Sequence, residues 1–310
     1  EQIKAEYSLQ ACVVFSSAMA QYAQPLLPQV PMLVDFVDVD SAKWTQYAPA
    51  HRWPLSLLYR LEGRRLLAYE RAMATLARRS YFVTPNETAL FLSQAPECQG
   101  RVQSMGNGVD ADFFVPNPLR LNPFEAGEQA VVFTGAMDYW PNIDGVSWFA
   151  ADVLPLLRTR WPLARFYIVG RSPSSQVQAL AGAHVVVTGT VPDVRPYLQY
   201  ASAVVAPLRV ARGIQNKILE AMAMQQPVVT GSSCADAIGA TVGQGLLRAD
   251  TPEEFVEALK PLLESPYNAA ALGQQARRYV EQECSWQAHL SGIDSCLGSL
   301  RAKPPQEVVA

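Results

Sequence analysis

Residues 207–229 read PLRVARGIQNKILEAMAMQQPVV, and the folding pattern of the chain is clearest in this segment. A short apolar strand is predicted directly before the segment, at residues 203–206, and a second one at its end, at residues 227–230. Between them the spacing predicts a basic loop and then a helix over residues 214–224. A strand, a helix and a second strand in this order form the repeating unit of an α/β protein with parallel sheets.

Residue types that bind phosphate gather in the loop and the first helical turn of this segment. Gly213 frees the backbone where the helix opens, and a helix N-terminus offers unpaired N–H groups and a positive partial charge to an anion. Arg209 and Arg212 precede the helix, and Lys217 lies one turn inside it. Because Arg binds phosphate as a fork and Lys binds it as a point charge, we expect a phosphate ligand here.

Glu220 follows Lys217 by three residues, so the two side chains lie on the same face of the helix. A carboxylate at this place could accept hydrogen bonds from two neighbouring sugar hydroxyls. The alternative is a surface Lys–Glu pair, which contributes only about 0.2–0.5 kcal/mol. Because the pair stands beside a glycine and two arginines at a strand end, we favour the ligand site.

The second half of the chain contains enough strands for a complete doubly wound sheet. Further strands are predicted at residues 130–134, 165–169, 184–188 and 245–248. Ligands of such sheets bind beyond the carboxyl ends of the strands, so the turns at these ends are candidate sites. Gly135 follows the first of these strands, Arg171 follows the second shortly after its end, and Val191 follows the third.

The first half of the chain shows only four strands, at residues 11–15, 32–37, 81–83 and 101–105. It opens in the middle of the pattern and without an initial Met, so we expect an N-terminal domain that lacks its first βαβ units. Residues 116–127 contain three prolines and no apolar periodicity, which indicates a linker. We therefore predict a partial Rossmann-like domain over residues 1–120, a second Rossmann-like domain over 121–284, and a final helix with a frayed tail over 285–310.

Composition excludes several classes of protein. Of the 310 residues, 49% are hydrophobic and 17% are charged, and the net charge is −3, which fits a folded protein and not a disordered one. The charge gives no global attraction to nucleic acid or to an anionic membrane, and it leaves a local basic patch open. The five cysteines and three histidines are scattered and show no metal-ligand spacing, so no metal site is expected.

The motif of residues 213–229, G-x-x-x-K-x-L-E-A-M-A followed by P-V-V, resembles the donor-binding signature of retaining GT-B glycosyltransferases of the glycogen-synthase-like superfamily. Residues 35–44 (DFVDVDSAKW) and 211–217 (ARGIQNK) look like the sugar transferases of the exosortase/PEP-CTERM exopolysaccharide system. The resemblance covers essentially the whole chain. It implies a GT-B fold: two Rossmann-like domains that face each other across a cleft, with the helix around Trp286 crossing back toward the N-terminal domain.

The resemblance also implies roles for particular residues. Glu220 matches the second Glu of the family's E-x7-E motif, which typically holds the ribose hydroxyls of the donor. Val191 would lie near the base. The segment that faces the donor diphosphate would comprise Gly213, Ile214, Gln215, Asn216 and Lys217.

The chain departs from the family pattern at two places. Arg212 stands where the first Glu of the E-x7-E motif is expected. The family's R…K-G element is absent after the strand that ends at residue 134, where the turn begins with Gly135. We expect Arg171 or Arg212 to supply part of the missing positive charge at the diphosphate.

The function implied by the resemblance is that of a retaining, hexosyltransferase-type glycosyltransferase in exopolysaccharide biosynthesis. It would move a sugar from a UDP- or GDP-sugar to a glycan or lipid-linked acceptor, with the donor as substrate and without a separate cofactor. Arg212, Lys217 and the helix N-terminus would stabilise the charge on the leaving diphosphate. A non-catalytic nucleotide-sugar-binding or assembly subunit and a nucleotide-sugar 2-epimerase stay open as alternatives.

Asp35, Asp38 and Asp40 alternate at the end of the strand over residues 32–37. One of these carboxylates could orient or deprotonate an acceptor hydroxyl, and the alternative is turn formation and helix capping. We favour function and take Asp38 as a catalytic candidate. Asn107 is kept as a further candidate beside the expected cleft.

A long helix is predicted over residues 55–80, and it is rich in arginine. These arginines could meet anionic lipid headgroups. A solvated helix face with Glu62 and Glu70 as partners is the reading we favour. We therefore expect a cytoplasmic protein and leave a peripheral contact with the inner membrane open.

Overall fold

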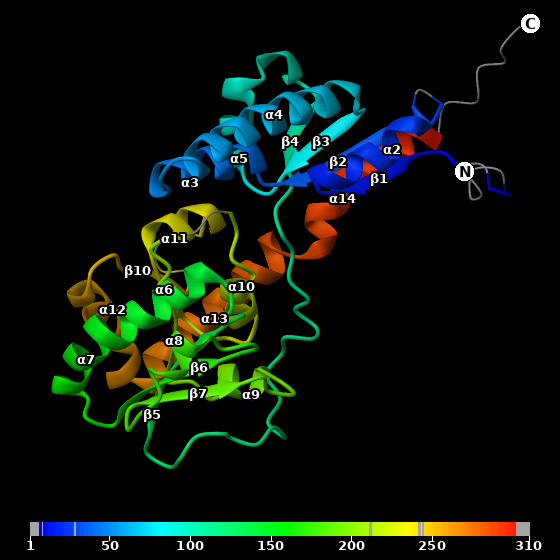
Figure 1. The fold of residues 1–310 in the computed structure, drawn as a ribbon. Coiled ribbons are helices and arrows are strands. Elements are labelled where there is room, and N and C mark those ends of the chain that lie inside the picture. The colour runs from blue at the N-terminus through cyan, green and yellow to red at the C-terminus, as the bar shows by residue number, and fades with distance from the viewer. Residues whose placement is uncertain are drawn as a thin grey trace, which may run out of the picture. The chain divides into compact units, whose positions relative to one another are not determined.

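The computed structural model describes residues 6–7, 9–27, 29–210, 213–240, 243 and 245–301. Contacts within the chain divide it into two compact units (Figure 1). Unit 1 comprises Glu1–Gly106 together with His289–Ala310, and unit 2 comprises Asn107–Ala288. Each unit is built on a parallel sheet, as the alternation of apolar runs and helical segments predicts.

Unit 1 contains a four-stranded sheet in the order β1-β2-β3-β4, and all neighbouring strands are parallel. Its core includes the contacting rings of Phe36, Phe82 and Phe91. The strands are β1 (Cys12–Phe15), β2 (Met32–Val37), β3 (Arg79–Phe82) and β4 (Val102–Ser104). The helices are α2 (Ala20–Ala23), α3 (Asp40–Tyr47), α4 (Leu55–Leu76) and α5 (Pro85–Gln94), with 3-10 turns η1 (Ser17–Met19), η2 (Gln24–Leu26), η3 (Ala48–Ala50) and η4 (Pro96–Cys98).

Unit 2 contains a six-stranded sheet in the order β10-β9-β8-β5-β6-β7, again with all neighbours parallel. Its strands are β5 (Gln129–Thr134), β6 (Ala164–Val169), β7 (Val185–Gly189), β8 (Ala203–Ala206), β9 (Val228–Thr230) and β10 (Leu246–Arg248). The chain builds outward from β5 in one direction through β6 and β7, and then in the other direction from β8. The direction of winding therefore reverses between β5 and β8, which is the place where open α/β sheets bind their ligands.

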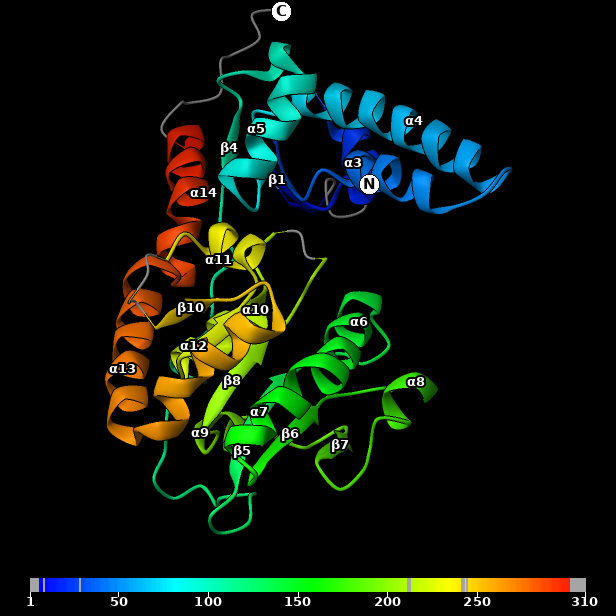
Figure 2. The same ribbon diagram turned by 90° about the vertical axis from the view of Figure 1, so that its left-hand side faces the viewer.

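The connections of unit 2 are helical. They are α6 (Trp140–Trp148), the π-turn η5 (Phe149–Val153), α7 (Leu154–Arg160), α8 (Ser175–Gln178), α9 (Arg195–Gln199), α10 (Asn216–Ala223), α11 (Ser232–Ile238), α12 (Pro252–Glu264) and α13 (Pro266–Glu283). The last helix, α14 (Trp286–Arg301), begins in unit 2 and continues into unit 1. Figure 2 shows the helices of unit 2 around its sheet, with α13 along one side.

The core of unit 2 lies on both faces of its sheet, because alternate residues of a strand point to opposite sides. Val131 and Phe133 of β5 belong to the larger cluster, with Phe149 of η5. Ala130 and Val132 of the same strand belong to a smaller cluster on the other face, packed against partly buried rings that include Phe124.

Each strand of the described residues lies within two residues of the bounds that the sequence predicts. The sequence predicts one continuous helix over residues 142–161, but the structure divides this region into α6, the π-turn η5 and α7. Pro155 is the second residue of α7, and since proline has no N–H it cannot complete the helical hydrogen bond of that turn. The helices α3 and α11 were not predicted, because neither has a clear apolar periodicity.

The division between the units falls at Gly106, whereas the sequence suggests residue 120. The backbone N–H of Val109 donates to the Cys284 carbonyl at 3.0 Å. The Arg277 guanidinium donates to the carbonyls of Ala111 at 3.1 Å and Phe114 at 2.9 Å. These bonds hold residues 109–114, directly before the proline-rich segment, on unit 2.

Candidate functional site

A pocket of about 670 Å³ lies in unit 2 at the carboxyl ends of β5, β6 and β7 and beside the N-terminus of α10. It therefore occupies the reversal point of the sheet, and its size is typical of small-molecule sites. It is lined by Asn107, Thr134, Gly135, Ala136, Val169, Gly170, Arg171, Thr190, Val191, Val194, Ile214, Asn216, Lys217 and Glu220.

Lys217 reaches from α10 across the pocket floor to the turn after β5. Its ammonium donates to the Oδ1 atom of Asn142 at 2.5 Å and lies 4.3 Å from the centre of the Phe133 ring. Asn142 is almost fully buried and donates through Nδ2 to the Ala136 carbonyl at 2.8 Å. Burial lowers the pKa of Lys217 to about 7, although the nearby Glu220 carboxylate acts in the opposite direction. The cation is thus held in place while its charge is left for a ligand to balance.

Two glycines make room for this lysine. A Cβ atom at Gly135 would lie 2.8 Å from the Lys217 Nζ atom and 2.9 Å from the Nδ2 atom of Asn142. A Cβ atom at Gly170 would lie only 1.7 Å from the Gly135 carbonyl oxygen. The turns after β5 and β6 therefore pack backbone against backbone, and the open side of Gly135 is filled by the Lys217 ammonium.

The N-terminus of α10 supplies backbone donors at the same pocket. Gln215 is its N-cap residue, and the Gln215 side chain makes no capping hydrogen bond to the first turn. Gly213 has a φ of 65°, a left-handed conformation that glycine adopts at no steric cost. Asn216 is anchored because its Oδ1 atom accepts a hydrogen bond from Asn107 Nδ2 at 3.1 Å. The N-terminus of α10 thus borders the pocket, and its dipole favours an anion there.

Glu220 lies one turn further along α10 and lines the pocket with Lys217. Burial raises the pKa of its carboxyl group, and the Lys217 charge lowers it in part. Within the described part of the chain, no side chain donates a hydrogen bond to this carboxylate. Its oxygens are therefore free to accept hydrogen bonds from ligand hydroxyls.

Seven of the predicted binding and catalytic residues surround this one pocket: Gly135, Arg171, Val191, Ile214, Asn216, Lys217 and Glu220. Gly213 and Gln215 stand in the segment that leads into α10. Arg212 lies outside the described residues. Their roles in binding or catalysis remain predictions.

Arg209 does not take the role that the sequence suggests. Its guanidinium forms two hydrogen bonds with the Asp144 carboxylate, at 2.5 and 3.1 Å. The hydrogen bond with Asp144 raises the pKa of Arg209 above its usual value. Asp144 lies 65 positions away from Arg209 in the sequence. The sequence around Arg209 therefore could not predict this ion pair.

Asp38 belongs to unit 1, where its carboxylate lies 2.8 Å from the Lys43 ammonium. The same ammonium lies 3.0 Å from Asp40, which also accepts a hydrogen bond from the Ser17 hydroxyl at 3.2 Å. Both carboxylates raise the pKa of Lys43 against the opposing effect of burial. This local ion-pair network fits the turn-forming alternative, and a catalytic role for Asp38 stays a prediction.

Asn142 is the residue that the sequence did not single out. It is the third residue of α6. A single asparagine near the start of a helix is not a distinctive signal in the sequence. What identifies it is its position between Lys217 and the turn after β5, which only the folded chain shows.

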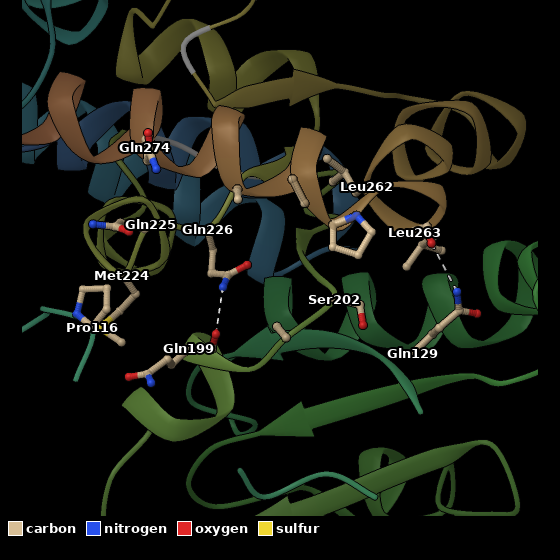
Figure 3. A pocket seen from close by; sticks show the side chains of 14 residues that line it. Pro116, Gln129, Gln199, Ser202, Met224, Gln225, Gln226, Leu262, Leu263 and Gln274 are labelled. Carbon is tan, nitrogen blue, oxygen red and sulfur yellow. Dashed lines mark hydrogen bonds between the residues drawn. The ribbon is translucent and has the colours of Figure 1, made fainter. Parts of the chain in front are cut away.

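A second pocket, of about 470 Å³, lies near the opposite end of the sheet, and Figure 3 shows it from close by. Gln129 and Ser202 stand at or before the amino ends of their strands, and the Gln226 side chain donates to the Gln199 carbonyl at 3.0 Å. None of its described lining residues carries a charge. This second pocket therefore offers no charged side chain to a phosphate, unlike the pocket of Lys217.

Among the described residues, no group of three or more His, Cys, Asp or Glu side chains could hold a metal ion. The described helices also include none that is both long and apolar enough to cross a membrane.

Comparisons with known proteins give a family match and a fold likeness. Residues 128–265 match the protein family described as glycosyl transferases group 1, and this range contains every pocket residue except Asn107. No curated protein sequence matches the chain significantly.

Several solved structures share the fold. The sucrose-phosphate synthase of Thermosynechococcus elongatus superposes with a TM-score of 0.74 at 19% identity, over 97% of this chain and 76% of that chain. HepE of Anabaena, solved in complex with UDP, superposes with a TM-score of 0.70 at 16% identity, over 96% and 80%. A UDP-forming trehalose-phosphate synthase from Burkholderia xenovorans superposes with a TM-score of 0.69 at 13% identity, over 97% and 77%. These likenesses confirm the fold class expected from the sequence: GT-B, with Rossmann-like domains.

Proposed function

We propose that this protein is a glycosyltransferase that moves a sugar from a nucleoside-diphosphate sugar to an acceptor hydroxyl. The observation that carries this proposal is the grouping of a buried lysine, a helix N-terminus and a carboxylate in one pocket at the reversal point of the sheet. The match of residues 128–265 to the glycosyl transferases group 1 family supports it.

In this proposal the donor lies along the start of α10. Its diphosphate faces the first N–H groups of that helix and the Lys217 ammonium, where opposite charge and hydrogen bonding act together. Glu220, one turn on, accepts hydrogen bonds from the two ribose hydroxyls. Val191, in the turn after β7, lies beside the base, and Arg171 adds a positive charge at the pocket edge.

The chemistry asked of these residues is charge stabilisation. As the bond between the sugar C1 atom and the β-phosphate oxygen breaks, the electron pair goes to the leaving diphosphate. Lys217 and the α10 N–H groups lie where this charge develops. The acceptor oxygen forms the new bond to C1, and its proton leaves with the diphosphate or with a base. We propose retention of configuration, by attack on the face from which the diphosphate leaves.

The substrate class follows from the same reasoning together with the resemblance in the sequence. HepE was solved with UDP and with UDP-glucose, so a UDP-sugar is the first donor to test, and a GDP-sugar is the second. The acceptor we propose is a glycan or a lipid-linked sugar in exopolysaccharide synthesis.

Calorimetric titration with UDP, GDP and ADP tests the donor site. We expect one diphosphate to bind, and Lys217→Met to weaken its affinity at least tenfold, as expected for the loss of one charge-assisted hydrogen bond of about 1.5–3 kcal/mol. Lys260→Met is the matched control, since Lys260 lies on α12 outside the pocket. Equal binding by Lys217→Met and the parent would refute the phosphate assignment.

Transfer is then measured with the sugar form of the nucleotide that binds, and the anomeric configuration of the product is read by NMR. A product with inverted configuration would exclude retention. Donor binding without transfer to any acceptor would favour the non-catalytic subunit, and a changed sugar released without acceptor would favour the epimerase.

A further inference from the structure

Apolar side chains are exposed on the first turns of α4, in unit 1. Trp53, just before the helix, is 79% exposed, and Leu57 inside it is 58% exposed. Leu58 and Leu61 are exposed in the same way. These four residues form what we call the apolar stripe: Trp53, Leu57, Leu58 and Leu61.

The stripe lies opposite the side of α4 that packs on unit 1. Gly63 is buried against α3, because a Cβ atom there would lie 2.6 Å from the Thr45 hydroxyl. Leu61 precedes Gly63 by two residues, which on a helix corresponds to roughly 200° of rotation. Leu57 and Leu58 stand four and three residues before Leu61 and so share its face. Figure 2 shows α3 along the inner side of these turns.

The apolar stripe is flanked by arginines. Arg64 and Arg65 continue its face one turn further along α4, and Arg52 and Arg60 stand beside its start. All four are exposed, and in the described part of the chain none of them has an ion-pair partner. A helix with leucine and tryptophan on one face and arginine around them is typical of segments that lie on membrane surfaces.

Of the two carboxylates that the sequence suggested as partners of these arginines, Glu70 does not pair with them. Glu70 is fully buried, and its carboxylate accepts hydrogen bonds from the Ser41 hydroxyl at 2.6 Å and from the Ser41 backbone N–H at 3.2 Å. Glu62 is then the one exposed carboxylate on the described turns that carry the stripe. The reading as a solvated face with Glu62 and Glu70 as partners is therefore wrong for Glu70.

We propose that the first turns of α4 dock on an anionic lipid bilayer, with the apolar stripe in the acyl boundary and the four arginines among the headgroup phosphates. The charge pattern favours a bilayer over a second copy of the chain. A symmetric contact through the stripe would bring the arginines of both copies together, and like charges at an interface are costly. The docking is independent of the donor pocket, which lies in unit 2.

Co-sedimentation with lipid vesicles tests this proposal. We expect the protein to bind vesicles of equal parts phosphatidylglycerol and phosphatidylcholine, and to bind pure phosphatidylcholine far more weakly. Arg64→Gln with Arg65→Gln should lower the partition coefficient about fivefold for each arginine. Leu57→Ser with Leu61→Ser should abolish binding. The matched control is Leu119→Ser with Leu121→Ser, because these two leucines are also highly exposed but belong to unit 2.

The outcomes separate the alternatives. Absence of binding to the anionic vesicles, or equal binding to both kinds of vesicle, would overturn the proposal. The proposal would also be overturned if the α4 variants melted like the parent and still bound the anionic vesicles as well as the parent does. A dimer that depends on Leu57 and Leu61, seen by sedimentation velocity in place of vesicle binding, would assign the stripe to self-association. Nucleotide affinity should be equal in all these variants.

Discussion

The Lys217 ammonium donates a hydrogen bond to the Asn142 side-chain oxygen at 2.5 Å, and the Asn142 amide is in turn fixed by the Ala136 carbonyl at 2.8 Å. A flexible side chain from α10 is thereby tied to the turn after β5. Among the described residues, no carboxylate forms an ion pair with this lysine, so a bound anion can supply the opposite charge. Asn142 therefore acts through Lys217 and is a positioning residue.

Replacement of Asn142 tests this relationship. Asn142→Leu removes the oxygen that holds the ammonium, so we expect the affinity for the nucleoside diphosphate to fall about tenfold. Asn142→Asp keeps the shape of the side chain but adds a negative charge. This charge raises the pKa of Lys217, and it also repels the diphosphate and so weakens its binding. Calorimetric titration over a range of pH measures both effects. Asn268→Leu, an exposed site on α13, is the control. An Asn142→Asp variant that binds diphosphate more tightly than the parent would contradict the assignment.

The buried charge of Lys217 should cost stability. Burial lowers its pKa to about 7 in the folded protein, from an ordinary value of 10.5. Between these values the unfolded chain holds a proton that the folded protein has released, so the free energy of unfolding rises with pH across this window. At pH 7 the parent carries the cost of the buried ammonium, and Lys217→Met should resist urea better than the parent while it loses diphosphate binding.

Urea unfolding at the two ends of this pH window measures the effect. The rise in stability with pH should be smaller in Lys217→Met than in the parent, and it should persist in Lys260→Met. If Lys217→Met were less stable than the parent at pH 7, the lysine would have a structural role instead.

The strands and the α10 motif could be predicted from the sequence because their signals are local. An apolar run bounded by turn residues predicts a strand, and the i, i+3 spacing of Lys217 and Glu220 places both on one helix face whatever surrounds them. The strand order then brings the turns after β5, β6 and β7 together with the start of α10. Contacts between distant segments could not be predicted: neither the Asn142–Lys217 bond nor the Arg209–Asp144 pair has a counterpart in the spacing of residues.

Glu220 should be coupled to the donor ribose. We expect the parent to bind the 2′-deoxynucleotide less tightly than the ribonucleotide, because a hydrogen bond to a charged group contributes about 1.5–3 kcal/mol. Glu220→Ala should bind both forms with the same, weaker affinity. The difference of differences from four titrations gives the coupling energy. A coupling energy near zero would mean that Glu220 does not contact the ribose of the donor.

The glycines of the pocket turns should separate stability from binding. At Gly170 a methyl group meets the Gly135 carbonyl, a backbone atom that cannot move aside, so Gly170→Ala should destabilise unit 2 by about 1–3 kcal/mol or more. At Gly135 the methyl group meets the Lys217 ammonium and the Asn142 amide, and the backbone φ of 158° strains any residue other than glycine. Gly135→Ala should therefore lose diphosphate affinity, with a smaller loss of stability than Gly170→Ala. Gly182→Ala is the control, since nothing lies within 4 Å of a Cβ atom there. Thermal melting and titration distinguish the three variants.

Glu70 should give unit 1 a pH dependence of the opposite sign. Burial raises the pKa of this carboxyl group to about 7 from 4.5, although the Ser41 hydrogen bonds act to lower it. Between these values the folded protein holds a proton that the unfolded chain has lost, so the free energy of unfolding falls as pH rises through the window, by at most about 3 kcal/mol. Glu70→Gln removes the titrating group and keeps its shape, so urea unfolding at the two ends of the window should show a smaller fall than in the parent. Glu62→Gln, an exposed carboxylate on the same helix, should keep the fall of the parent. An equal fall in Glu70→Gln would mean that Glu70 is already ionised throughout the window, with Ser41 outweighing the cost of burial.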